Sequence, residues 1–160
     1  MGKPSILIVD DQRDVLATVK KDLAPLEAYF TLVECESAAE AKEILNELDA
    51  GGEAAALIIC DHIMPQQNGV DFLIELNHDA RFQPLKKLLL TGLATHQDTI
   101  TAINQARIDR YIEKPWEPDA LLRMVKELVT LFLLRSGLDY QPYLPILDQE
   151  ILYQEIKKRT

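Results

Sequence analysis

The feature that most constrains this sequence is a strict alternation of short apolar runs with segments of helical periodicity. The runs are continuously apolar, which is typical of strands buried on both faces of a parallel sheet. The segments between them repeat apolar residues every three or four positions, which predicts amphipathic helices. Five strand–helix pairs in this order predict an α/β fold with a doubly wound parallel sheet. The expected strands are 5–9, 29–35, 56–60, 88–90 and 110–112, and the expected helices begin near 12, 37, 68, 96 and 118.

The chain is expected to divide into a main domain, 3–135, and a linker with a C-terminal helical extension, 136–160. Gly137 interrupts the helical pattern, and two prolines and two tyrosines in 140–145 predict an extended connector. Asp148 is placed to cap a short final helix. The organisation is therefore one compact domain with an appendage.

Composition narrows the classes of function. The 160 residues include 17 Lys and Arg against 26 Asp and Glu, which gives a net charge of -9 and a pI near 4.8. Such an acidic chain is not expected to bind nucleic acid or an anionic membrane directly. The N-terminus lacks the pattern of a signal peptide, and no run approaches the roughly 20 apolar residues of a membrane span. A cytoplasmic location is expected.

Cysteine and histidine give no sign of a metal centre. Cys35 and Cys60 lie 25 positions apart in apolar surroundings, without CxxC spacing, and are expected to be buried reduced thiols. The histidines His62, His78 and His96 share no ligand spacing and are expected at the surface.

Polar residues stand where the predicted strands end. Asp10 and Asp11 follow the first strand, Asp61 the third and Thr91 the fourth, and Lys114 comes shortly after the fifth. Ligands of open parallel sheets bind beyond the carboxyl ends of the strands, so these side chains are expected to meet at one edge. Taken singly, the two adjacent aspartates resemble a helix cap, and Lys114 a solvated lysine.

Three neighbouring carboxylates need a compensating cation, because they repel and raise one another's pKa. Lys114 and a divalent ion are the candidates, and hard oxygen ligands favour Mg²⁺. A carboxylate beside such an ion can attack phosphorus and form an acyl phosphate. Lys114 and the ion would neutralise charge on the transferring oxygens, and Thr91 could donate a hydrogen bond to one of them.

Several motifs occur in one order: Ile-Leu-Ile-Val-Asp-Asp at 6–11, Asp-His-Ile-Met-Pro at 61–65 with Asn-Gly at 68–69, Leu-Leu-Thr-Gly at 89–92, and Tyr-Ile-Glu-Lys-Pro at 111–115. Together they resemble the receiver domain of bacterial two-component response regulators, over about residues 3–132. The resemblance implies a flavodoxin-like five-stranded sheet of order 2-1-3-4-5. It also implies phosphorelay signalling, with no enzymatic activity beyond self-phosphorylation and slow autodephosphorylation.

The resemblance also implies roles for single residues. Asp61 would be the phosphoacceptor, taking the phosphoryl group from the phosphohistidine of a sensor histidine kinase or phosphotransfer protein. Asp11 would be a direct Mg²⁺ ligand, Asp10 a ligand through water, and the backbone carbonyl of Ile63 a further ligand, with Asp61 in the same shell. Lys114 would pair with the phosphoryl group.

The resemblance also implies a conformational switch and a slow loss of the phosphoryl group. The hydroxyl of Thr91 would move toward the phosphoryl oxygen, and the ring of Tyr111 would turn into the vacated space. Ile63 and Leu93 are apolar at positions that in this family influence attack by water on the acyl phosphate. Slow self-dephosphorylation is therefore the hypothesis.

The sequence says less about the output domain or partner that the chain would control. The stretch 107–111 lacks the acidic pair of the winged-helix transcription-factor subfamily, whereas Lys114-Pro115-Trp116 is similar to receivers joined to enzymatic or signalling output domains. The helix 117–135 carries more apolar residues than one core-facing stripe requires. Either the extension folds back over this helix, or the helix and extension form a homodimer or output-domain interface.

Three other functions are weighed against this one. A pseudo-receiver, an interaction scaffold that works without phosphate, usually loses an acid or the lysine, and all are present here. A haloacid-dehalogenase-like phosphatase needs a second aspartate two positions after the nucleophile, where this chain has Ile63. A flavodoxin-like cofactor binder would carry a phosphate loop after the first strand, where Asp10 and Asp11 would repel phosphate.

Overall fold

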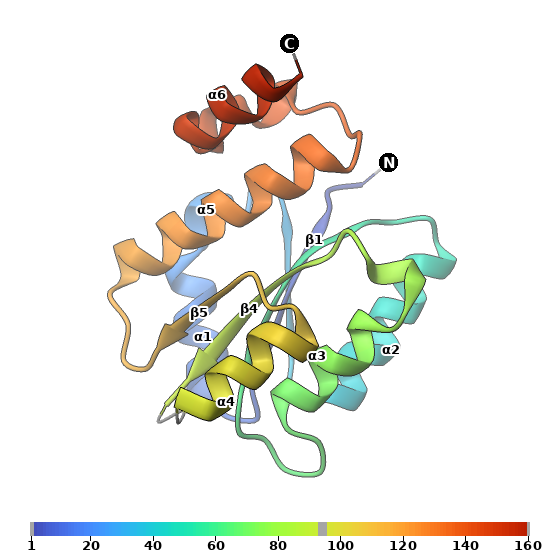
Figure 1. Cartoon of the computed structure of the whole chain (residues 1–160), viewed down its shortest axis with the longest axis vertical. Helices are drawn as coiled ribbons and strands as arrows, with labels where there is room; N and C mark the ends of the chain where they lie inside the picture. Colours follow the sequence, from blue (N-terminus) through green and yellow to red (C-terminus); the bar gives the residue numbers. More distant parts are fainter. Residues whose placement is uncertain (1, 93–95, 160) are drawn as a thin grey trace.

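The computed structural model describes residues 2–92 and 96–159 of the chain. A parallel sheet of five strands, in the order β2-β1-β3-β4-β5, forms the centre of the molecule (Figure 1). This arrangement confirms the expected fold class and strand order. The strands are β1 (Ser5–Val9), β2 (Thr31–Cys35), β3 (Ala55–Asp61), β4 (Lys86–Thr91) and β5 (Arg110–Glu113).

Helices cover both faces of the sheet (Figure 1). Side chains of α1 and α5 pack in one hydrophobic core, and side chains of α2 and α3 pack in a second core on the opposite face. None of the helices in the described part of the chain has both the length and the apolar character needed to cross a membrane. The helices are α1 (Arg13–Asp22), α2 (Ala38–Ala50), α3 (Gly69–Asn77), α4 (His96–Thr101), α5 (Pro118–Arg135) and α6 (Gln149–Lys158).

The two central strands explain the continuous apolar runs of the sequence. All five residues of β1 are buried, as are the last six of β3. In the sheet Val9 pairs with Cys35 on one side and with Cys60 on the other, so that β1, β2 and β3 end at the same level. This register places Asp10 and Asp61 next to each other at the carboxyl edge. The two cysteines are buried free thiols, as expected.

Three elements differ from the expectation. The first helix, which the apolar spacing predicts from 12 to about 27, ends at Asp22 and is followed by a separate 3₁₀ turn, η1 (Ala24–Leu26), because Pro25 cannot continue the α-helical hydrogen bonds. The fourth helix, expected over about 96–105, changes after Thr101 into a π-helical turn, η3 (Ala102–Ala106). The segment expected as an extended connector is a 3₁₀ helix, η4 (Gln141–Ile146). Its prolines favour φ values that a 3₁₀ turn also uses.

The C-terminal extension folds back over α5 (Figure 1). The ring of Tyr143 lies 5.5 Å from that of Phe30 and 6.1 Å from that of Tyr29. Ile146, Leu147 and Leu152 are buried in the same core as α1 and α5. The extension therefore completes one core of the main domain.

Polar contacts join the extension to α5. The buried hydroxyl of Thr130 accepts a hydrogen bond of 2.9 Å from the amide of Asp148, the residue that caps α6. Arg135 pairs with Glu155 at 2.9 Å, and Arg159 donates to the carbonyl of Leu134. Helix α5 has more apolar residues than one core-facing stripe requires. Three of these additional residues are buried: Val129, Leu133 and Leu134. Of the two possibilities left open by the sequence, the structure thus shows the fold-back.

Removing the apolar contact of α6 is expected to destabilise the whole domain. Leu152 is 9 % exposed, and the next residue, Tyr153, is 67 % exposed. Leu152→Ala should lower the free energy of unfolding by about 2–3 kcal/mol, because it leaves a cavity in the core. The matched variant Tyr153→Ala should change it by less than about 0.5 kcal/mol. Urea denaturation measures both, and a loss for Leu152→Ala as small as that expected for Tyr153→Ala would show that the burial of Leu152 does not stabilise the domain.

Candidate functional site

Polar side chains from four strands gather at the carboxyl edge of the sheet. Asp10 directly follows β1, Asp61 and Thr91 are the last residues of β3 and β4, and Lys114 directly follows β5. These strands occupy neighbouring places in the sheet, and the register pairs Asp61 with Leu90. The structure therefore brings the predicted residues to one edge, as parallel strands require.

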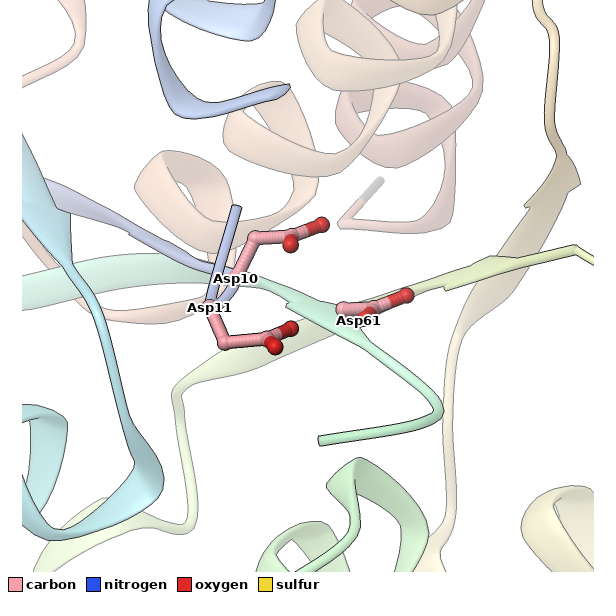
Figure 2. A group of neighbouring side chains, drawn as sticks. All are labelled: Asp10, Asp11 and Asp61. Carbon is pink, nitrogen blue, oxygen red and sulfur yellow. The ribbon is translucent and has the colours of Figure 1, made fainter. Parts of the chain in front are cut away.

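Three carboxylates form the centre of the site. Figure 2 shows the side chains of Asp10, Asp11 and Asp61 extending to the same side beyond β1 and β3. Oxygens of all three lie within 4.8 Å of one another. Asp10 is fully buried and Asp61 is 6 % exposed, whereas Asp11 is exposed. Asp10 is also held by the backbone amide of Gln12, which donates to its Oδ1 at 2.9 Å.

Lys114 bridges two of the carboxylates. Its Nζ lies 2.8 Å from Oδ1 of Asp61 and 3.1 Å from Oδ2 of Asp10. Burial acts to lower the pKa of Lys114, but the hydrogen bonds to the two aspartates outweigh it, so the pKa is raised. The lysine is therefore charged at neutral pH and compensates part of the negative charge.

The compensation by Lys114 is incomplete. Burial raises the pKa of Asp61, and the charges of Asp10 and Asp11 add to this effect, whereas Lys114 opposes it. The net pKa of Asp61 lies above its ordinary value, so further positive charge here would favour its ionised form. Three carboxylates with one exposed member are the hard oxygen donors that suit Mg²⁺. The residues present thus fit the ion.

The raised pKa predicts a stability that depends on pH. The folded state binds a proton at Asp61 more readily than the unfolded chain, so ionised Asp61 destabilises the fold at neutral pH. This penalty decreases as the pH falls through the folded pKa toward the ordinary value. In the presence of a chelator, Asp61→Asn should have a higher Tm than the parent protein at pH 7, and the difference should shrink on acidification. A lower Tm for the variant at pH 7 would contradict this.

Thr91 and Tyr111 lie on neighbouring strands and differ in their exposure to solvent. Thr91 is 1 % exposed, and its Oγ1 has no hydrogen-bond partner among the described residues. Tyr111 pairs in the sheet with Leu89, two residues before Thr91, and is 43 % exposed. A buried hydroxyl without a partner is costly, so Thr91 is ready to donate to a group that enters the site. Leu93, the other residue expected to influence the lifetime, lies outside the described residues.

The loop after β3 positions Asp61. The amide of His62 donates to the carbonyl of Leu90 at 2.9 Å, and the amide of Gly69 donates to the carbonyl of His62 at 2.8 Å. A Cβ at Gly69 would lie 1.9 Å from the carbonyl oxygen of Asp61, so only glycine fits. His62 is buried at 9 % exposure, so the surface placement expected for it was wrong. The side chain of Ile63 is 71 % exposed, beside the site.

One contact near Lys114 was missed in the sequence. The indole Nε1 of Trp116 donates to Oδ2 of Asp22, the last residue of α1, at 2.8 Å. This bond ties the segment after Lys114 to α1, although 94 positions separate the two residues. The only signal in the sequence was a tryptophan beside the Lys-Pro motif, and no pattern pointed to Asp22.

The fold and this arrangement of acids and lysine define a class of protein. A sequence model of the response regulator receiver domain matches residues 6–126, more than half of the chain. The chain therefore belongs to the response regulator receiver domain family, which is regulatory. This confirms the resemblance seen in the motifs.

Relatives of known role support the assignment. Over 132 residues the chain is 31 % identical to the hydrogenase transcriptional regulatory protein HoxA of Bradyrhizobium diazoefficiens, covering 82 % of this chain and 25 % of that protein. It is 35 % identical to the response regulator Rre1 of Synechocystis, covering 81 % and 53 %. It is 33 % identical to the chemotaxis protein CheY1 of Helicobacter pylori, covering 72 % and 89 %. The chain thus spans about a quarter of the length of HoxA and half of that of Rre1.

Solved structures agree. The signal receiver domain of an HD domain-containing protein from Pseudomonas fluorescens superposes with a TM-score of 0.71 at 27 % identity, covering 82 % of this chain and 98 % of that domain. A CheY-like receiver domain protein from Methanospirillum hungatei superposes with a TM-score of 0.68 at 27 % identity, covering 82 % and 97 %.

Proposed function

We propose that this chain is a phosphorylation-dependent switch in which Asp61 accepts a phosphoryl group in the presence of Mg²⁺. One observation supports this most strongly. A carboxylate that is almost buried and has a raised pKa lies within reach of two further acids, and a lysine bridges two of the three. A merely structural salt bridge would not need three carboxylates for one lysine.

In the proposed reaction, an oxygen of Asp61 attacks the phosphorus of a phosphohistidine. A P–O bond forms, the P–N bond breaks, and the imidazole leaves with the bonding electron pair. The ligands of Mg²⁺ would be Asp10, Asp11, Asp61 and the backbone carbonyl of Ile63. The bound ion would supply positive charge next to the phosphoryl oxygens. The ammonium group of Lys114 lies 2.8 Å from Oδ1 of Asp61, and it would pair with the phosphoryl group once this group is bound to Asp61.

The switch would use the orphan hydroxyl of Thr91. A phosphoryl oxygen on Asp61 offers this buried donor its missing partner, and movement of Thr91 would open space on the side of Tyr111. The ring of Tyr111 is half-exposed beside a cavity of about 380 Å³ lined by Ile103, Ile108 and Arg110. Inward rotation of the ring would change this surface and report phosphorylation to a partner.

The proposed partners are a sensor histidine kinase or phosphotransfer protein upstream and an output domain or separate effector downstream. HoxA is about four times longer than the part of it that this chain matches. This difference in length supports an output domain in some members of the family. A homodimer or output contact at the extension would use its outer face, where Leu144, Tyr153 and Ile156 are exposed. A cytoplasmic, bacterial setting belongs to the same proposal.

Intact mass spectrometry tests the proposal. The protein is incubated with Mg²⁺ and a small-molecule phosphodonor, with and without chelator, beside Asp61→Asn and the remote variant Asp49→Asn. The expected result is a gain of one phosphoryl group that the chelator prevents, absent in Asp61→Asn and retained in Asp49→Asn. No gain in the folded parent protein, with an active donor, would refute the proposal.

The phosphoryl lifetime gives a further prediction. The apolar side chain of Ile63 is exposed beside Asp61 and cannot form a hydrogen bond to an attacking water. Ile63→Gln should therefore accelerate loss of the phosphoryl group, whereas Ile63→Leu should not. Loss of phosphate is timed by intact mass after removal of the donor. Equal lifetimes for the two variants would refute a role for this position.

A further inference from the structure

Lys87 is a buried cation that the candidate site does not use. It lies on β4, is 4 % exposed, and precedes the apolar residues 88–90. Burial lowers its pKa, with the charge of Asp109 opposing this effect. An ammonium group in such surroundings is costly unless it is hydrogen-bonded, so its partners indicate its role.

The ammonium group of Lys87 caps the end of a helix. Its Nζ donates to the carbonyl of Ala106 at 2.9 Å, and Ala106 is the last residue of the π-helical turn η3. At this end Arg107 adopts a left-handed conformation with φ of 53°, and its amide bonds to the carbonyl of Ala102. The last carbonyls of a helix lack partners within it, and a cation there also complements the helix dipole. The ammonium group of Lys87 supplies both a hydrogen-bond donor for such a carbonyl and a positive charge at this end of the helix.

Three further hydrogen bonds hold the same end of the helix. The amide of Lys87 donates to Oδ2 of Asp109 at 2.8 Å, and the amide of Asp109 donates to the carbonyl of Lys87 at 2.9 Å. From α3, the side-chain amide of Asn77 donates to the carbonyl of Gln105 at 3.3 Å. The C-terminal end of the α4–η3 unit is therefore joined both to β4 and to α3.

The other end of β4 carries the proposed switch residue. Thr91 is four positions after Lys87 and, because side chains alternate along a strand, projects from the same face. About 13 Å of strand separates the two. At one end of this face a buried ammonium group is bonded to the helix terminus, and at the other a buried hydroxyl has no partner among the described residues.

We infer that Lys87 is a positioning residue that anchors the C-terminal end of α4–η3 during the switch. Movement of Thr91 then displaces the N-terminal part of α4, while 102–108 stays attached to β4. The anchor itself is a property of the unphosphorylated protein. The direction of the movement rests on the proposed function, so the two parts are tested separately.

Hydrogen exchange measured by mass spectrometry tests the anchor without phosphate. Lys87→Met keeps the length of the side chain but removes the donor, and should accelerate exchange in 102–108 about tenfold, for the loss of one buried hydrogen bond. Lys86→Met is the matched control, because Lys86 is 3.8 Å from Asp109 in a partly exposed ion pair. Exchange in β1 monitors global stability. Equal exchange of 102–108 in Lys87→Met and the parent protein would overturn the anchor.

The second part adds Mg²⁺ and the phosphodonor. In the parent protein, phosphorylation should change exchange in 96–101 and leave 102–108 unchanged, whereas in Lys87→Met the change should extend through 102–108. The same distribution in both proteins would overturn the directing role, even if the anchor holds. If the parent protein takes up no phosphoryl group, both the proposed function and the directing role of Lys87 are refuted. The exchange measurement without phosphate still tests whether Lys87 anchors the helix end. Should Lys87→Met not fold, Lys87→Gln keeps a neutral donor and should show intermediate protection.

Discussion

Lys114→Met is expected to slow phosphoryl transfer to Asp61 by about 100-fold or more. The substitution removes the ammonium group that lies 2.8 Å from Asp61 and 3.1 Å from Asp10, and leaves three carboxylates without their protein cation. Loss of one preorganised charge at a transferring group typically costs 10²- to 10³-fold in rate. Intact mass as a function of time, at saturating Mg²⁺ and phosphodonor, measures this rate.

The matched control is Lys20→Met. Lys20 is paired with Glu34 at 3.6 Å on the surface, and both side chains are about 40 % exposed. Such a pair contributes little, so this variant should be phosphorylated at the parental rate. If Lys114→Met also keeps the parental rate, Lys114 is only a structural partner of the two aspartates.

Gly69→Ala is expected to be the most disruptive single-methyl change in the site. The added Cβ would lie 1.9 Å from the carbonyl oxygen of Asp61 and 3.1 Å from Sγ of Cys60. The first of these atoms belongs to the backbone, so either the end of β3 or the loop 62–69 must move. We expect a loss of about 3 kcal/mol in the free energy of unfolding. Phosphorylation of the folded fraction should also slow, because the Asp61 carboxylate would be displaced.

Gly92→Ala is the control for this substitution. A Cβ at Gly92 meets none of the described residues within 4 Å, although Gly92 directly follows Thr91 at the same edge of the sheet. Its free energy of unfolding should change by less than about 0.5 kcal/mol. Equal stability of Gly69→Ala and the parent protein in urea denaturation would show that the loop adapts freely and does not position Asp61.

Much of the candidate site followed from the order of residues alone. The acids at 10, 11 and 61 follow apolar runs, Lys114 comes shortly after the fifth expected strand, and parallel strands bring their carboxyl ends to one edge. Thr91 was found by the same argument. Tyr111 was assigned a role by resemblance alone, and in the structure its ring is half-exposed.

The close contacts were not predictable in this way. Gly69 belonged to a recognised motif, but its approach to the Asp61 carbonyl depends on how the loop after β3 returns to α3. Lys87 lay just before the expected strand 88–90 as one of two adjacent lysines, and nothing in the sequence distinguished the buried one from Lys86. The hydrogen bond between Trp116 and Asp22 joins residues 94 positions apart, beyond any local pattern.

The sequence by itself determined the class of fold and the edge at which the chemistry lies, because burial and strand polarity leave a periodic pattern along the chain. Only the tertiary structure showed that apolar residues of α5 pack against the chain's own extension. The apolar pattern of α5 does not specify what covers it, and the packing depends on contacts such as that between Thr130 and Asp148. Likewise, a helix end that accepts a bond from Lys87 exists only once β4 and η3 are packed together.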